Sequence, residues 1–360
     1  MEKGTITEYF LGANSRHGFY SLYDSFFDPE GGDFLWVIKG GPGCGKSSFM
    51  KKIAAAMSDA GYDTELIRCS GDPDSLDGLY IPALRVGYVD GTSPHVVEAV
   101  YPGAASLYLD LGACYDASAL EKKLSGISEL NRRYKGLYAE AYGLIASSSQ
   151  LFPGADPSIW GEAARQRLEK RACGAASRLF RNADARGSVK RCFLGALTCR
   201  GRVFESSTVK KLCSRVYLVD NGLGMADSYL RFIYEKSVSA GCGVILAPDP
   251  VAPERLQALL FPDIGTGFIA SDAGFDGAPS RCVHIDALAD KAAVAAGRAE
   301  RKKRLKLSLD AELLAVEKLS EAKRLHDELE KIYNPCVDFP AVYAVADDHI
   351  AWLLSAGSAG

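Results

Sequence analysis

Residues 34–47 read Phe34-Leu-Trp-Val-Ile-Lys39 and then Gly40-Gly-Pro-Gly-Cys-Gly-Lys-Ser47. The first part is a short apolar run, which favours a buried strand. The second part matches the pattern G-x-x-x-x-G-K-[ST], a glycine-rich turn that leads from a strand into a helix. Residues 48–60 have a helix-compatible composition. The sequence therefore predicts a strand, a loop and a helix in direct succession.

This loop carries the residue types that a polyphosphate needs. Its glycines allow positive φ and a close approach of backbone N–H groups to phosphate oxygens, and the N-terminus of the next helix favours anions. Lys46 supplies a cation for the β- and γ-phosphates, and the Ser47 hydroxyl is a magnesium ligand. We predict a P-loop that binds ATP, or a closely related nucleoside triphosphate, with Mg²⁺; a glycine-rich turn without a ligand is the alternative. The predicted nucleotide-binding residues are Gly40, Gly41, Pro42, Gly43, Cys44, Gly45, Lys46, Ser47 and Ser48.

A second acidic group on the magnesium side is expected at the end of a neighbouring strand. Asp90 follows residues 86–89, which are mostly apolar. We predict that its carboxylate holds magnesium through water, so that Asp90 joins Ser47 as a metal-binding residue and Lys46 as a catalytic residue. An aspartate that only forms a turn is the alternative, and Asp110 competes for the same role.

Other polar residues leave their roles open. Asp72 and Asp74 lie in the acidic segment 69–77, where they could orient an attacking water or contact a second substrate. Helix capping and turn formation explain them equally well. His95 could contact nucleotide or pack against the fold.

The sequence repeats with an offset near 180 residues. Phe10-Leu-Gly-Ala13 returns as Phe193-Leu-Gly-Ala196, and the apolar residues 34–38 return as 216–219. A glycine turn, a helical stretch and another strand follow in the same order each time. The ordered series indicates duplication, and strands that alternate with helical stretches predict βαβ units. We expect an α/β protein with two tandem P-loop NTPase-like halves, each with a parallel sheet and each followed by a helical segment.

The second loop, residues 221–228, lacks the lysine. Aligned on the final serine, Asp227 stands where Lys46 stands in the first loop. A carboxylate there repels a triphosphate, so we predict no hydrolysis at this loop and a scaffold role for the second half as a pseudo-site. The arginines that could be lent to the first site are Arg200, Arg202 and Arg215.

Helical regions follow both halves. Apolar residues recur at three- and four-residue spacing from 124 to 144, and a second helical run covers 162–180. A similar stripe runs from Leu309 through Leu313 to Ile332. We interpret the stripes as seams between packed helices, with a partner-binding coiled coil as the alternative.

The basic run 298–306 is expected to be a solvated helix face, with a patch that contacts phosphate or nucleic acid as the alternative. The division expected for the chain is a P-loop domain at 1–117, a helical insertion at 118–190, a degenerate P-loop-like domain at 191–283 and a C-terminal helical region at 284–360.

Composition excludes several classes of protein. The net charge of −3 argues against a dominant electrostatic grip on nucleic acid. No apolar run approaches the roughly 18 residues of a membrane span, and the first residues lack the apolar core of a secretory signal. The ten cysteines form no C-x-x-C pair, which disfavours a zinc ribbon. We expect a cytoplasmic protein with reduced thiols.

The motifs resemble a family of bacterial P-loop ATPases, mainly from Firmicutes, that are built from two tandem P-loop halves. The resemblance covers nearly the whole chain, is specific in the first half and is weaker from 150 to 260. It implies ATP binding at Gly40–Ser47 and hydrolysis, and Asp227 departs from relatives in which both loops look intact. The stretches that carry it are Tyr9-Phe-Leu-Gly12, Gly18-Phe-Tyr-Ser21, Ile38-Lys-Gly-Gly-Pro-Gly43, Asp72-Pro-Asp-Ser-Leu-Asp-Gly78, Asp90-Gly-Thr-Ser-Pro-His95, residues 321–330 and Val337-Asp-Phe339.

Three functions are compatible with the sequence. The leading hypothesis is a magnesium-dependent ATPase that uses only the first loop. A nucleotide-gated binding module with little turnover, acting on an unidentified protein or small molecule, is the second. A small-molecule kinase with an acceptor site at 72–77 is the third.

Overall fold

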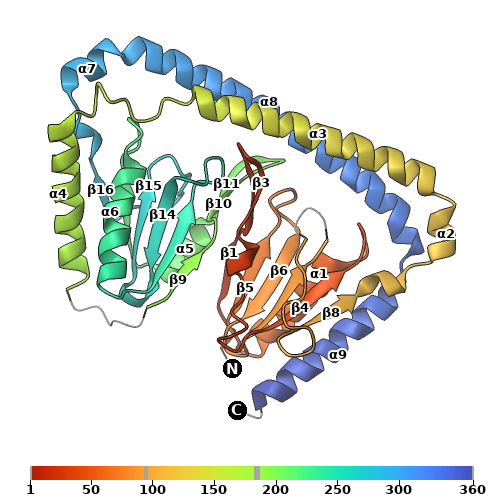
Figure 1. Ribbon diagram of the computed structural model, residues 1–360. Helices are drawn as coiled ribbons and strands as arrows, with labels where there is room; N and C mark the ends of the chain where they lie inside the picture. The colour runs from red at the N-terminus through yellow and green to blue at the C-terminus, as the bar shows by residue number, and fades with distance from the viewer. Residues whose placement is uncertain (1, 93–95, 182–186, 359–360) are drawn as a thin grey trace. The chain divides into compact units, whose positions relative to one another are not determined.

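The chain forms two compact units. The structure is a computed structural model that describes residues 2–92, 96–181 and 187–358 (Figure 1). Unit 1 consists of Met1–Gly12, Ser21–Ala141 and Val316–Gly360, and unit 2 of Ala13–Tyr20 and Tyr142–Ala315. The two units interleave along the chain, and the four-part division expected from the sequence stays a prediction.

A six-stranded mixed sheet forms the centre of unit 1. Its strands are β1 (Ile6–Tyr9), β4 (Phe34–Lys39), β5 (Thr64–Arg68), β6 (Leu76–Ile81), β7 (Val86–Asp90) and β8 (Ser106–Asp110). Their order is β1-β5-β6-β7-β4-β8. β4 lies between β7 and β8 and is parallel to both, while β6 is antiparallel to both of its neighbours. The strand that precedes the glycine loop is therefore flanked on both sides by parallel strands.

Unit 2 repeats this sheet. Its strands are β9 (Val189–Arg191), β12 (Arg215–Val219), β13 (Val244–Pro248), β14 (Leu256–Phe261), β15 (Thr266–Ala270) and β16 (Arg281–Val283). Their order is β9-β13-β14-β15-β12-β16, and every pair has the same relative direction as its counterpart in unit 1. Two tandem α/β halves are thus present.

The sheets are mixed, although parallel sheets were expected. A parallel connection needs a crossover of a dozen or more residues. Only residues 69–75 separate β5 from β6, and only residues 82–85 separate β6 from β7. Connections this short can only reverse the chain, so β6 runs antiparallel, and the same holds for β14.

Smaller elements complete each half. A hairpin of β2 (Gly12–Ser15) and β3 (Gly18–Ser21) has its counterpart in β10 (Gly195–Thr198) and β11 (Gly201–Phe204). The remaining short elements are η1 (Tyr23–Ser25), η2 (Leu111–Cys114), α2 (Ala117–Glu121), α5 (Ser206–Leu212), η3 (Pro262–Ile264), η4 (Asp286–Leu288), α7 (Lys291–Ala296) and η5 (Asn334–Cys336).

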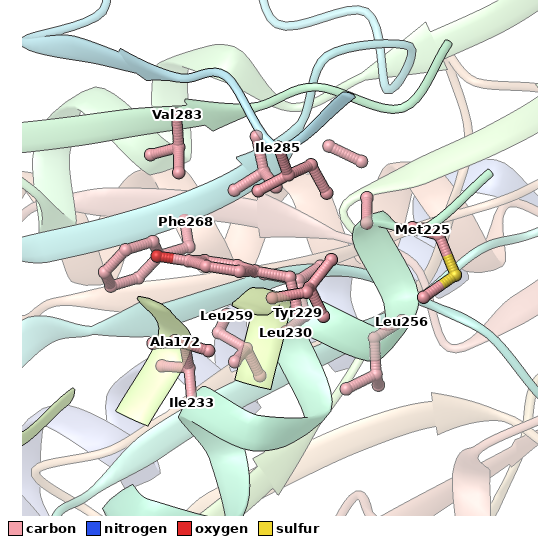
Figure 2. Packing of buried hydrophobic residues seen from close by; sticks show 14 of the residues in the cluster. Ala172, Met225, Tyr229, Leu230, Ile233, Leu256, Leu259, Phe268, Val283 and Ile285 are labelled. Atoms are coloured by element: carbon pink, nitrogen blue, oxygen red, sulfur yellow. The ribbon is translucent and has the colours of Figure 1, made fainter. Parts of the chain in front are cut away.

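Two helices pack together on each sheet. In unit 1 these are α1 (Lys46–Asp59) and α9 (Phe339–Ser358), which bury Phe49, Ile53 and Val342 in one cluster. In unit 2 they are α6 (Ala226–Ser239) and α4 (Glu162–Leu179). Figure 2 shows side chains of α6, including Tyr229, close to Phe268 in this cluster. The buried apolar faces of α1 and α6 fix the position of each helix on its sheet, and therefore also the position of the loop that precedes it.

Two long helices contribute residues to both units. They are α3 (Leu124–Leu151) and α8 (Arg298–Tyr333). In unit 1 they meet through Leu137, Ala322 and Leu325, and in unit 2 Ser308 Oγ donates to the Ser148 carbonyl at 2.8 Å. A seam between the two helices is thus present, and Leu137, Leu319 and Leu329 of the predicted stripes are buried, whereas Ala322, Leu325 and Ser308 were not among the predicted residues.

The prediction that Leu309 and Leu313 pack in the helix seam was wrong, because their exposed fractions are 50% and 63%. Four of the buried positions of α8 recur every seven residues, as in a coiled coil, and three of these four are small or polar, so hydrophobicity alone does not reveal them. They are Ser308, Ala315, Ala322 and Leu329, and Leu319 and Leu325 are buried between them. Most residues of the basic run 298–306 are exposed on α8, as expected.

Candidate functional site

The backbone of the loop between β4 and α1 requires glycine. Gly40, Gly43 and Gly45 have φ values of 151°, 67° and 89°, a region that residues with a Cβ rarely adopt. A Cβ on Gly40 would also lie 2.6 Å from the sulfur of the fully buried Cys44. Gly45 precedes α1 and no side chain caps that helix. The first N–H groups of α1 are therefore suited to an external anion.

Lys46 is folded over this loop. Its Nζ donates to the carbonyl oxygens of Gly40 and Gly41 at 2.7 and 2.9 Å, and it lies 3.5 Å from Asp90 Oδ2. The Lys46 side chain is 11% exposed. The ammonium is thus fixed beside the glycine backbone, with a carboxylate next to it.

Asp90 and Asp110 end the two strands that flank β4. The Asp90 Oδ1 accepts from the Thr92 N–H at 2.9 Å, which leaves Oδ2 directed at Lys46. Asp110 is exposed, and its Oδ1 accepts from the Gly112 N–H as the cap of η2. Asp90 therefore forms its turn and also reaches the loop, whereas a capping role accounts for Asp110.

Ser47 connects the loop to a third strand. Its Oγ accepts from the Leu76 N–H at 3.0 Å, which orients the hydroxyl and leaves its second lone pair for another partner. Ser48 follows in the first turn of α1.

Sequence reasoning did not single out Asp77 as a neighbour of Asp90. Gly78 pairs with Val89 in the antiparallel β6–β7 ladder, so Asp77 and Asp90 lie at the same end of this ladder. Asp77 is buried, and burial together with its carboxylate raises the pKa of Tyr23 and of the Cys69 thiol. Only the strand register reveals this second acid beside Asp90.

Sequence reasoning also missed the C-terminal segment, which holds the outside of the loop. With its amide assigned by hydrogen bonding, Asn334 donates to the carbonyls of Gly43 and Glu330 at 3.0 and 3.2 Å. Tyr115 donates its hydroxyl to the Pro42 carbonyl at 3.1 Å, and its ring lies 5.5 Å from that of Tyr333. Burial raises the pKa of Tyr115, which keeps the phenol protonated as a donor. The loop is thus braced by Tyr115 and by Asn334, which are far from it in the chain.

Asp72 and Asp74 form a turn. Asp72 accepts from the Ser75 hydroxyl and the Asp74 N–H, and its Oδ2 lies 3.3 Å from Lys323 Nζ. The carbonyl of Asp74 accepts from Lys51. Turn formation thus accounts for both residues, and His95 lies outside the described residues.

One group of potential metal ligands lies on α8. The ligand atoms of His326, Asp327 and Glu330 are within 4.8 Å of one another. Lys323 forms ion pairs with Asp327 and Asp72 and so offsets the acidic charge of this group.

The second loop aligns differently from the sequence expectation. Leu256 N–H donates to Asp227 Oδ1 at 2.8 Å, as Leu76 N–H does to Ser47 Oγ, and α6 and α1 have 14 residues each. Asp227 is therefore the counterpart of Ser47, and Ala226 is the counterpart of Lys46. The placement of Asp227 at the lysine position was wrong, because this loop is one residue shorter than the first.

The second loop, residues 221–228, is held by contacts within the protein. Asn221 Oδ1 accepts from the Ala226 N–H at 3.1 Å, and Trp160 Nε1 donates to the Leu223 carbonyl at 3.0 Å. A Cβ on Gly224 would lie 2.6 Å from the Ala155 nitrogen. In each unit, the connection between a long helix and the next helix thus presses against the loop.

Two of the candidate arginines have partners in unit 2. Arg202 forms two hydrogen bonds of 2.7 Å with Glu312. Arg215 donates to the Ile264 carbonyl at 3.1 Å. These contacts give both side chains a structural role there.

Comparison of the chain with protein-family models, with curated proteins and with solved structures gave no match. Among the described helices, we find none with the length and apolar character that crossing a membrane requires.

Proposed function

We propose that Gly40–Ser47 is a P-loop that binds ATP with Mg²⁺, and that the chain hydrolyses ATP at this loop alone. The observation that carries the proposal is the position of Lys46. Its ammonium rests on the carbonyls of Gly40 and Gly41 and lies 3.5 Å from Asp90. A cation, flexible glycine amides and a carboxylate at one strand end are the groups that phosphoryl transfer needs.

Each residue has a role in this proposal. The N–H groups of residues 43–48 wrap the β-phosphate, and Lys46 exchanges its loop carbonyls for phosphate oxygens. The Ser47 hydroxyl would hold magnesium, the Asp90 carboxylate would hold it through water, and the bound ion would supply positive charge beside the β- and γ-phosphates. Lys46 then stabilises the charge that develops on the transferred phosphoryl group.

The second loop lacks the lysine and the serine hydroxyl. Ala226 replaces the lysine, Asp227 replaces the metal-binding serine, and Asn221 occupies the first helical N–H group. We infer that the second half does not hydrolyse a triphosphate and serves as a scaffold.

Replacement of Lys46 by alanine tests the site. We expect Lys46→Ala to lower affinity for MgATP at least about tenfold, since hydrogen bonds to charged groups contribute about 1.5–3 kcal/mol. Titration calorimetry measures the affinity, and phosphate release measures turnover. Asp227→Ala is the control and should retain turnover per folded molecule. Wild-type behaviour of Lys46→Ala would contradict the assignment.

The same assays separate the alternatives. Tight MgATP binding without phosphate release would indicate a nucleotide-gated binding module. ATP consumption that depends on an added hydroxyl compound would indicate a small-molecule kinase. We expect phosphate release by the purified chain without a second substrate.

A further inference from the structure

Unit 2 contains a surface hollow that the proposed ATP site does not use. Its volume is about 330 Å³, within the range of small-molecule sites. β9, α6 and the connection from β13 to β14 line it, together with Tyr20. The lining residues used below are Tyr20, Arg191, Arg231, Tyr234, Leu246 and Leu256.

The floor of the hollow is apolar and well packed. Leu246 and Leu256 are buried and belong to the main cluster of unit 2, in which Figure 2 labels Leu256 beneath Met225. Pro248 and Pro253 are also buried lining residues. An apolar floor of this kind favours a ligand with an apolar or aromatic part.

The walls carry donors that the protein leaves open. Within the described residues, no hydrogen bond or ion pair is found for the Arg191 side chain or for the hydroxyl groups of Tyr20 and Tyr234. The ring of Tyr20 packs edge-on against Phe193, with 6.2 Å between centroids, so its position is fixed. Three side chains with donor groups therefore border one hollow, and none of them has an acceptor among the residues that the structure describes.

The charges around the hollow favour an anion. Arg231 is held by Asp227 at 2.9 Å, and the carboxylate of Glu254 pairs with Arg16 at 2.8 Å and lies 3.9 Å from Arg255. The charged lining residues are therefore Arg191, Arg231 and Glu254, and the carboxylate of Glu254 is already paired with Arg16. This excess of positive charge suits a phosphate monoester, whose oxygens also suit guanidinium and hydroxyl donors.

The first half lacks this arrangement. The strand registers make Arg191 the counterpart of Glu8, since Arg191 pairs with Leu246 and Glu8 pairs with Leu66. When α6 is aligned with α1 from their first residues, Tyr234 is the counterpart of Ala54. The charge reversal and the added phenol show that the hollow is not inherited from the shared fold.

We propose that this hollow binds a small phosphate monoester with an aromatic group. Arg191 and Arg231 contact the phosphate, the hydroxyl groups of Tyr20 and Tyr234 donate to it, and Leu246 and Leu256 support the aromatic part. This site is independent of the loop at Gly40–Ser47.

Calorimetric titration of the full chain with phenyl phosphate tests the proposal, with inorganic phosphate and phenol as comparison ligands. We expect phenyl phosphate to bind more tightly than either. Arg191→Glu should weaken binding at least tenfold, and Tyr234→Phe severalfold. Arg281→Glu is the matched control, because it makes the same charge change on β16, at the opposite edge of the same sheet, and it should bind like the wild type.

Binding of phenyl phosphate should survive Lys46→Ala, so failure of this site and failure of the ATP site can be told apart. Equal affinity of the wild type, Arg191→Glu and Tyr234→Phe would overturn the proposal, as would the absence of binding to the wild type. Circular dichroism and thermal unfolding verify that each variant is folded.

Discussion

At the scale of single residues, three of the positions at which the two loops differ decide what each loop can hold. Gly40 corresponds to Asn221, Lys46 to Ala226 and Ser47 to Asp227, as the strand and helix registers show. The first loop offers an ammonium and uncapped N–H groups to an anion. The second loop caps its own helix with Asn221 and pairs Asp227 with Arg231. One fold thus supports an anion-accepting loop and a self-satisfied loop.

A half-buried histidine predicts a pH dependence of stability. Burial lowers the pKa of His349, which contacts the Trp36 ring and lies 3.0 Å from the Tyr88 hydroxyl, whereas Asp348 opposes the shift. As pH falls below the ordinary histidine pKa of about 6.5, the unfolded chain binds a proton that the folded chain resists. The free energy of unfolding should therefore decrease with falling pH in this range.

Urea unfolding at pH 7.5 and pH 5.5 measures this effect. The loss of stability on acidification should be smaller in His349→Gln than in the wild type. An equal loss in both proteins would refute the role of His349.

At the scale of elements, the connection from α8 to α9 supports the glycine loop. Asn334 donates to the Gly43 carbonyl from outside the loop, and Phe339 lies within 3.5 Å of a Cβ placed on Gly45. These contacts hold outward-facing carbonyls, so that the N–H groups can face a ligand. The end of a 36-residue helix thereby becomes part of the loop's geometry.

Asn334→Asp should weaken MgATP binding severalfold, because a carboxylate cannot donate to the Gly43 carbonyl. One lost hydrogen bond costs about 1 kcal/mol, so the variant should still fold. Titration calorimetry gives the affinity and thermal unfolding gives the stability. Asn334→Gln keeps the donor and should recover part of the affinity; identical affinities in all forms would exclude the bracing role.

At the scale of the whole molecule, the duplication includes the helices. α3 and α4 follow the first half, and α8 and α9 follow the second. α4 packs on α6 within unit 2, and α9 packs on α1 within unit 1. Each unit therefore takes its covering helix from the segment that follows the other half in the sequence.

Hydrogen exchange tests whether both loops respond to nucleotide. MgATP should increase amide protection at residues 40–50, because the ligand binds the N–H groups of this loop. Residues 221–230 should show no change of comparable size, because Asn221 and Asp227 already occupy their donors. Equal protection of both segments would show that the second loop also binds nucleotide. Lys46→Ala should abolish the effect at the first loop.

Local patterns were sufficient for much of the fold. The glycines of residues 40–45, the lysine after them and the near-constant offset of the repeat indicate a loop between a strand and a helix, and two similar α/β halves. The placement of Asp90 at the end of a strand next to β4 also followed from the mostly apolar residues 86–89 that precede it. Such features depend on neighbours along the chain, which a sequence displays directly.

Other features required the folded chain. The positions of Asp77 and Asp227 depend on strand and helix register, and a one-residue deletion in the second loop shifted the sequence alignment at Asp227. The brace by Asn334 and the hollow at Arg191 bring together segments far apart in the sequence. The sequence by itself determined the residue types, the loop and the repeat, because local conformational preferences act within a few residues. The tertiary structure decided which acids, tyrosines and arginines share a site, because only close packing selects among many distant pairings.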